Sequence, residues 1–273
     1  QTYWTAIKAK DERGNWSPIS NCMSFTCLVD SIVVFPDTAL ERAIRLAISR
    51  PTDPIRRSHL LHLTNITAEY KGIVDLTGLE YCPALLYLFV RGNDASALRP
   101  LAGLTLLKRI NLIENEVSDI SPLSSLTTLE QLHLSNNPLG NLSPLAPMSG
   151  LTFLSLNTIP ATDFGALSNL TSLTMLHMAG NSIVDITMLQ NLVNLRELVV
   201  PANQIVDISP LANLDSLQSL YLTGNQISDI LPLVSNDGLG VGDFVYLEAN
   251  PLSATSISTY IPALQARGVT VTW

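Results

Sequence analysis

The chain has 273 residues, of which 47% are hydrophobic and 14% are charged, and its formal net charge is −8. An acidic surface of this kind argues against nucleic acid as a partner. No apolar run approaches the roughly 18 residues that a transmembrane helix needs, so we expect no membrane insertion within this chain. Three cysteines are too few for a disulfide framework, so we expect packing to hold the fold together.

Residues 1–30 are predicted to form a β-hairpin. Tyr3, Thr5 and Ile7 occupy alternate positions, as in a strand, and residues 11–15 have the composition of a turn before a second β-like run ends near Cys27. The sequence of residues 3–17 resembles the last two strands of a fibronectin type III domain. We therefore expect a partial domain here, whose earlier strands lie upstream in a longer protein.

Residues 31–62 are predicted to form a helical N-terminal cap. Asp37 is a suitable N-cap for an amphipathic helix with apolar residues at Leu40, Ala43, Ile44, Ala47 and Ile48. A second short helix is expected after Asp53-Pro54. Such a cap is required because the first repeat of a stacked array otherwise exposes its apolar face to water.

A repeat of 22 residues, Leu-x-x-Leu-x-Leu-x-x-Asn-x-Ile-x-Asp-Ile-x-Pro-Leu-x-x-Leu-x-x, dominates residues 63–252, giving about eight units. Its first position is Leu63, Leu85, Leu107, Leu129, Leu151, Leu173, Leu195 and Leu217. A unit this short has no closed core and buries its apolar stripe only by stacking on its neighbours. Apolar residues two apart predict one short strand per unit. The second half of each unit is too short for helical propagation and favours 3₁₀ or irregular turns.

Two polar positions recur in the units. The first is Asn93, Asn115, Asn137, Asn181, Asn203, Asn225 and Asn250, which we expect to bond buried backbone groups. This ladder breaks at Ile159, before Pro160, where we expect the least regular turn and favour strain over a binding feature. The second position is Asp75, Asp119, Asp163, Asp185, Asp207 and Asp229. We favour capping of the following turn for these carboxylates, although a stacked column also allows calcium.

Residues 253–273 are predicted to close the array with a helix, from the spacing of Ile257, Tyr260, Ile261 and Leu264, and a strand at residues 269–271. Together with the repeats and the N-terminal cap, residues 31–273 resemble the short leucine-rich repeats of bacterial internalin-like surface proteins. The resemblance implies an α/β solenoid, curved, with a parallel β-sheet on its concave face and short turns on its convex face. It also implies a surface or secreted bacterial protein that acts in adhesion or recognition.

The sequence contains no glycine-rich phosphate loop, nucleophile elbow or zinc-ligand spacing, so we expect neither catalysis nor a cofactor nor a metal site. His59 and His62 are assigned to the cap surface, and Cys82 to the core because it occupies the position of Leu104 one repeat later. Two alternatives to a binding module stay open. The solenoid is then either a structural spacer or the targeting arm of a larger extracellular enzyme.

The outward positions of the strands form two columns that vary between units while the core positions do not. Several are aromatic or apolar, whereas solvated sheet faces usually display Thr, Ser, Lys and Glu. We predict a ligand site on the concave face, formed by Tyr87, Phe89, Arg109, Asn111, His133, Phe153, Met175, His177, Tyr221 and Tyr246. Cross-strand stacking that only stabilises the sheet is the alternative. The expected ligand is a protein or a glycan, bound by a monomer.

Overall fold

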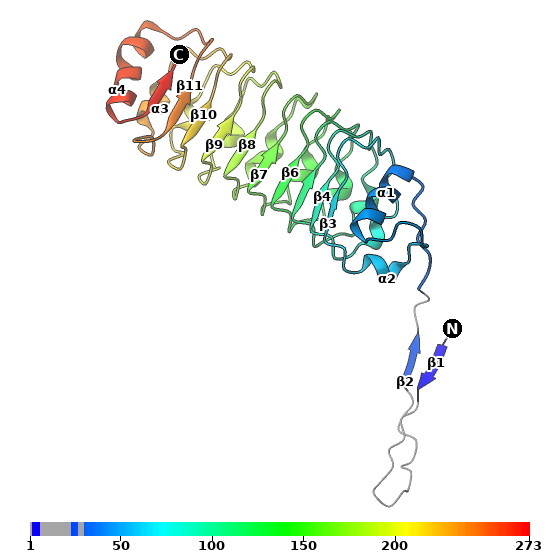
Figure 1. Ribbon diagram of the computed structural model, residues 1–273. Coiled ribbons are helices and arrows are strands. Elements are labelled where there is room, and N and C mark those ends of the chain that lie inside the picture. The colour runs from blue at the N-terminus through cyan, green and yellow to red at the C-terminus, as the bar shows by residue number, and fades with distance from the viewer. Residues whose placement is uncertain (1, 6–22, 27–29) are drawn as a thin grey trace, which may run out of the picture.

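The computed structural model describes residues 2–5, 23–26 and 30–273. Residues 30–273 form a curved solenoid whose strands lie side by side along its length (Figure 1). Near the N-terminus, β1 (Thr2–Thr5) and β2 (Met23–Thr26) pair in antiparallel orientation, as the predicted hairpin requires. The predicted turn at residues 11–15 lies outside the described residues, and the fibronectin resemblance stays a prediction.

The N-terminal cap contains α1 (Thr38–Ala47) and α2 (Arg57–Leu60), as expected. The Oδ1 atom of Asp37 accepts hydrogen bonds from the first-turn amides of Ala39 and Leu40, at 2.8 and 2.9 Å. Its Oδ2 atom accepts from the amides of Val74 and Asp75 in the first repeat, at 2.8 and 3.2 Å. One carboxylate therefore begins the helix and also fastens the cap to the repeats.

Ten parallel strands of three residues form a single sheet, in the order in which they occur in the chain. They are β3 (Asn65–Thr67), β4 (Tyr87–Phe89), β5 (Arg109–Asn111), β6 (Gln131–His133), β7 (Phe153–Ser155), β8 (Met175–His177), β9 (Glu197–Val199), β10 (Ser219–Tyr221), β11 (Phe244–Tyr246) and β12 (Thr270–Thr272). Neighbouring repeats pair at an offset of 22 residues, for example Tyr87 with Arg109. Residues that are 22 apart in the sequence therefore lie side by side on neighbouring strands and form a column across the sheet.

The opposite side of each repeat is a short turn. The 3₁₀ helices are η1 (Leu79–Tyr81), η2 (Arg99–Leu101), η3 (Ser121–Leu123), η4 (Ser143–Leu145), η5 (Gly165–Asn169), η6 (Thr187–Leu189) and η7 (Ser209–Leu211). The last repeat has an α-helical turn instead, α3 (Leu231–Ser235). Because these turns and the three-residue strands pack back to back, the fold is the predicted leucine-rich-repeat solenoid.

The C-terminal cap consists of a π-helical turn at Ser256–Tyr260, α4 (Ile261–Ala266) and β12, which agrees with the predicted helix and strand. Arg267, just after α4, donates hydrogen bonds to the carbonyl oxygens of Val234, Asn236 and Leu239. These bonds fasten the cap to the segment before β11, where three extra residues interrupt the repeat. The insertion therefore has a structural role that the repeat pattern did not reveal.

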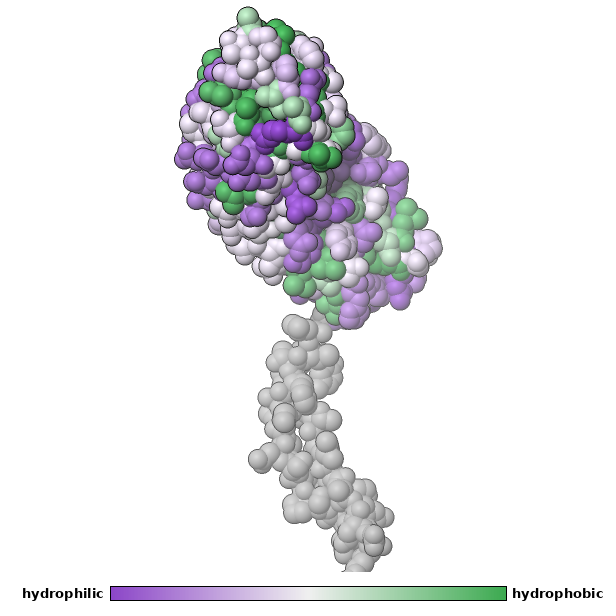
Figure 2. Space-filling model, turned by 90° about the vertical axis from the view of Figure 1, so that its left-hand side faces the viewer, coloured by the Kyte–Doolittle hydropathy of each residue, from purple (hydrophilic) through white to green (hydrophobic). Residues whose placement is uncertain are grey.

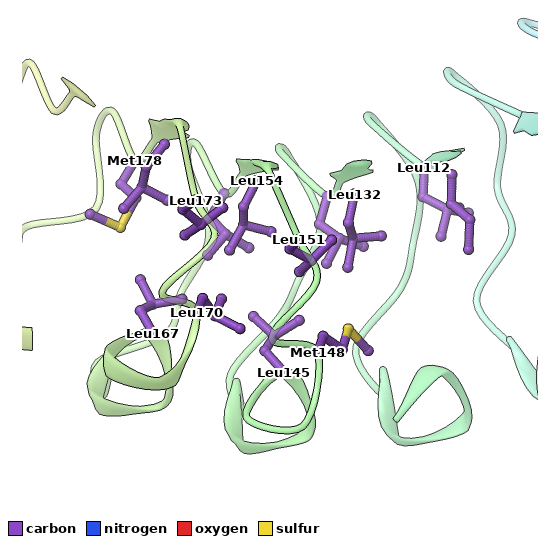
Figure 3. Close-up of a cluster of buried hydrophobic side chains, with 14 of the residues drawn as sticks. Leu112, Leu132, Leu145, Met148, Leu151, Leu154, Leu167, Leu170, Leu173 and Met178 are labelled. Atoms are coloured by element: carbon purple, nitrogen blue, oxygen red, sulfur yellow. The ribbon is translucent and has the colours of Figure 1, made fainter. Parts of the chain in front are cut away.

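The core is a layer of apolar side chains between the strands and the turns. In Figure 3, Leu132 and Leu154 descend from the strands toward Leu145 and Leu167 on the 3₁₀ turns, and all four are completely buried. Cys82 lies in the same core, as predicted, and burial raises the pKa of its thiol to about 12. The first leucine of every unit is buried as well, which explains why the period tolerates no shift.

The recurrent asparagine is a ladder, as predicted. Asn203 accepts hydrogen bonds from the amides of Asn181 and Ile183, both at 3.0 Å, through its side-chain oxygen. Its side-chain nitrogen donates to the carbonyl oxygens of Met178 and Val200, at 2.9 and 3.0 Å. Each asparagine thus joins two repeats by bonding backbone groups that lie out of reach of water.

Ile159 leaves a gap in this ladder. The carbonyl of Leu112 accepts from two asparagine side chains, Asn115 and Asn137, whereas that of Leu134 accepts only from Asn137 among the described residues. The backbone at the gap keeps the left-handed residue seen in the other turns, with φ of 53° at Thr158. The irregularity predicted here is therefore found in the hydrogen bonds and in the longer η5, and not in the conformation of this turn.

The aspartate column caps the turns, which confirms the interpretation that the sequence favoured. Asp119 accepts from the amide of Ser121 at 2.8 Å and from its hydroxyl at 2.9 Å, and Asp207 repeats this arrangement with Ser209. The hydrogen bond from the Ser121 amide is the main reason why the pKa of Asp119 lies below its usual range. Among the described residues, no group of three or more His, Cys, Asp and Glu side chains is placed to hold a metal ion.

Candidate functional site

All ten predicted site residues occupy outward positions of the sheet. In each strand the middle residue is buried and its neighbours point outward, as Ile110 is buried between Arg109 and Asn111. The sheet register brings the ten residues together in three groups along the concave face. The first group is Tyr87, Phe89, Arg109 and Asn111, the second is His133, Phe153, Met175 and His177, and the third is Tyr221 and Tyr246.

The second group has three rings in contact. The ring centroid of Phe153 lies 4.4 Å from that of His133, at an interplanar angle of 31°, and 5.1 Å from that of His177, edge to face. By register, Ser155 lies between the two histidines, and it is only 4% exposed. Phe153 therefore leans across from its own column and closes the space that the small Ser155 leaves.

The two histidines of this group differ in their charged neighbours. His177 Nε2 lies 2.7 Å from the carboxylate of Glu197 on the next strand. His133 has no such partner among the residues that the structure describes, and burial, together with the positive charges of Arg109 and His177, lowers its pKa to about 4. His133 is therefore uncharged at neutral pH. Glu197 was not among the predicted site residues, although its place one strand beyond His177 in the repeat register is readable from the sequence.

The third group is a stack of tyrosines. The rings of Tyr221 and Tyr246 are 4.6 Å apart and nearly parallel, with an interplanar angle of 9°. Phe244 lies on the same strand as Tyr246, parallel to it at a centroid distance of 6.4 Å, and is 40% exposed. The prediction omitted Phe244, yet its side chain is among the most exposed of the aromatic residues on this face.

The first group combines aromatic rings with a charge. Tyr87 is 41% exposed, and Phe89 on the same strand is half-buried. Arg109 lies beside Tyr87 in the register and, among the residues that the structure describes, takes part in no ion pair. Asn111 is held by its own backbone, because its side-chain oxygen accepts from the amide of Ile113 at 3.1 Å.

The predicted aromatic side chains are less exposed to solvent than expected. Of the predicted aromatic set, Tyr87 is exposed, whereas Phe89, Phe153, Tyr221 and Tyr246 are half-buried. Rings that stack across strands shield one another's faces, so the stacking alternative accounts for part of their burial. Their outer edges remain open. A partner on this face would therefore meet ring edges held in fixed positions.

Depressions elsewhere on the described surface do not coincide with these groups. One of about 450 Å³ lies between the turns at residues 161–165 and 181–188, behind the strands. Seen from its C-terminal end, the surface mixes hydrophilic and hydrophobic residues (Figure 2). No helix among the described residues is long and apolar enough to cross a membrane. A broad face with rings and few charges suits a macromolecular partner more than a small molecule.

Comparison with known proteins identifies the repeats. The family model "Leucine Rich repeats (2 copies)" matches residues 105–147 and 193–235. No curated protein matched the chain. Two solved structures from Listeria monocytogenes are similar over most of their length. An internalin (inlF) is 28% identical with a TM-score of 0.75, over 90% of this chain and 78% of that one. Internalin C2 is 29% identical with a TM-score of 0.73, over 88% and 95%.

A more distant structure shares the fold alone. The leucine-rich-repeat ectodomain of a plant membrane receptor kinase from Arabidopsis thaliana, solved in complex with Casparian strip integrity factor 2, has a TM-score of 0.60 at 22% identity. That match covers 71% of this chain and 25% of the plant chain. The fold and the repeats show that the chain is a leucine-rich-repeat solenoid, and it is similar in sequence and structure to the two Listeria internalins.

Proposed function

We propose that the protein is a non-enzymatic recognition module that binds a protein ligand on its concave face. The observation that supports this most is the set of fixed aromatic groups along the sheet, with Tyr87 and Phe244 each about two-fifths exposed. Aromatic side chains held in place before binding contribute contact area at low cost in conformational entropy.

The location on the concave face has a second support. The core, ladder and capping positions are fully explained by packing and hydrogen bonds within the solenoid. The outward positions are not, because residues as different as Arg109, Phe153 and Met175 occupy equivalent places. Similarity to the two Listeria internalins further favours a bacterial surface or secreted protein, and we include that location in the proposal.

The test compares two triple variants with the parent protein. In the first, Tyr87, Phe89 and Tyr221 are replaced by Ala on the concave face. In the second, the exposed residues Leu106, Val193 and Val206, which lie outside the strands, are replaced by Ala as a matched loss of apolar surface. Each protein, displayed in the same amount on beads, is incubated with one labelled extract of surface proteins.

We expect the parent and the second variant to capture the same proteins, and the first variant to lose them. Equal capture by all three proteins means that the concave face does not bind them and favours a spacer. Circular dichroism and thermal unfolding of each variant verify that all three retain the fold, since truncation of half-buried rings also removes packing.

A further inference from the structure

The outward face of the sheet has very few charges. Across the outward positions of β3 to β12, Arg109 and Glu197 are the residues that are fully charged at neutral pH, histidines aside. Glu197 has a partner, because its carboxylate lies 2.7 Å from His177. Arg109 has none among the described residues, although it is half-buried.

The neighbours of Arg109 leave its charge uncompensated. Tyr87 and Gln131 flank it in the register, and Asn111 follows on its own strand. All three are neutral, and His133 on the next strand is uncharged at neutral pH. A guanidinium group that is partly removed from water gains most from an anion when its surroundings offer no other.

The acidic residues of the adjoining repeats are already engaged. Glu130 lies 2.8 Å from the ammonium of Lys108, and Glu114 lies 2.6 Å from the guanidinium of Arg91. Neither carboxylate is therefore left to pair with Arg109. On a protein of net charge −8, this is a local site of positive charge bordered by the rings of Tyr87 and Phe89.

We propose that Arg109 is the anchor for a carboxylate of the protein ligand, supplied by an acidic peptide segment that lies across β4 to β6. This inference rests on the proposed function. It assigns the binding of an acidic residue to the part of the concave face around Arg109 and aromatic contacts to the other end. The planar guanidinium fits a carboxylate through two parallel hydrogen bonds. An apolar residue next to the acid packs on Tyr87 and Phe89.

A carboxylate fits this place better than a phosphate group. A phosphorylated side chain has a charge of about −1.5 to −2, and its recognition usually takes a cluster of arginines. Here one unpaired guanidinium is available, because Arg91 and Lys108 of the neighbouring repeats already pair with Glu114 and Glu130. One positive group therefore matches one negative group, as expected for an aspartate or glutamate side chain.

The experiment selects peptides from a phage-displayed library of random dodecapeptides on the immobilised full chain. Three proteins are compared, namely the parent, Arg109→Glu, and Arg99→Glu. Arg99 lies exposed on η2, on the opposite side of the repeat, so its replacement changes the net charge equally and serves as the control. We expect the parent and Arg99→Glu to enrich peptides with Asp or Glu at one fixed position.

Arg109→Glu is expected to lose those peptides and to select Lys or Arg at that position instead. For one enriched peptide, Arg109→Gln is expected to weaken binding at least about tenfold, as for other partly buried charge pairs at interfaces. Peptides without an acidic preference, or the same peptides on Arg109→Glu, overturn the inference. Absence of any enrichment also counts against it.

A fourth protein, with Tyr87 and Phe89 both replaced by Ala, separates this inference from the proposed function. If neither this variant nor Arg109→Glu changes the binding of any peptide, the peptides lie elsewhere and concave-face binding itself is wrong. If it loses them while Arg109→Glu retains them, the concave face binds but Arg109 is not the anchor. Proton NMR of His133 gives an independent readout, because a carboxylate on Arg109 raises the pKa of that imidazole.

Discussion

Replacement of Asn203 by Leu tests how much one rung of the asparagine ladder stabilises the solenoid. The side chain is 5% exposed and bonds backbone groups of two repeats. Leu has a similar volume but no polar atoms. We choose it over Ala because the space left by Ala is lined by amides and carbonyls that an inserted water molecule satisfies.

The expected loss follows from the groups left without a partner. The amides of Asn181 and Ile183 each donate to Asn203 in the structure, and both are buried. A buried donor without a partner costs about 1–3 kcal/mol, so the two together predict a loss of about 2–6 kcal/mol. The carbonyl of Val200 still accepts from Asn225, so it adds little to this sum, whereas the carbonyl of Met178 loses its bond from Asn203 and adds to the loss.

Urea unfolding followed by circular dichroism measures this loss as a change in the free energy of unfolding. Asn213→Leu is the control, because Asn213 belongs to the same repeat but is exposed, and we expect a change within about 0.5 kcal/mol. Repeat proteins sometimes unfold in parts, so the denaturant dependence of each variant must equal that of the parent. A loss below about 1 kcal/mol for Asn203→Leu refutes the role given to the ladder.

Other predictions concern the ladder gap, the insertion and the charges of the concave face. Ile159→Asn fills the missing rung, so it should lower the free energy of unfolding by less than about 1 kcal/mol, despite placing a polar residue in a buried position. Gly238→Ala should cost about 3 kcal/mol or more, because a Cβ there collides with a backbone carbonyl of the preceding repeat, whereas Gly103→Ala, with open space around it, should be close to neutral. Arg109→Gln should raise the pKa of His133 above about 4 in an NMR titration. Because the folded pKa of His133 lies below its ordinary value of 6.5, stability should fall as the pH drops from about 6.5 toward 4, and His133→Gln should remove this part of the pH dependence in urea titrations.

Much of the fold is readable from the sequence because the repeat keeps a length of 22 residues as far as the insertion before β11. A fixed offset of 22 residues places Leu129 and Leu151 in equivalent core positions and puts Tyr87 beside Arg109. The capping role of Asp119 followed from its place two residues before the amide it bonds. These features depend on local spacing, and local spacing is preserved by the fold.

The arrangement of the outward side chains was less predictable. The sequence places Phe153 and His133 in different columns, yet their rings touch because Ser155 leaves room for Phe153 to lean over. The sequence also led us to expect more exposure of the aromatic rings to water than the structure shows, because rings that stack on each other lose contact with water. Side-chain rotamers depend on the size of several neighbours at once, which a single alternating pattern does not encode.

The location of the ligand is tested most directly by photo-cross-linking. A photoreactive phenylalanine analogue replaces Tyr87 or Phe244, the two most exposed aromatic residues of the concave face. In a control protein it replaces Val206, which is 56% exposed and lies outside the strands. After incubation with the same extract of surface proteins and illumination, we expect cross-linked partners from the first two positions and none from Val206. Cross-links from Val206 alone contradict ligand binding on the concave face.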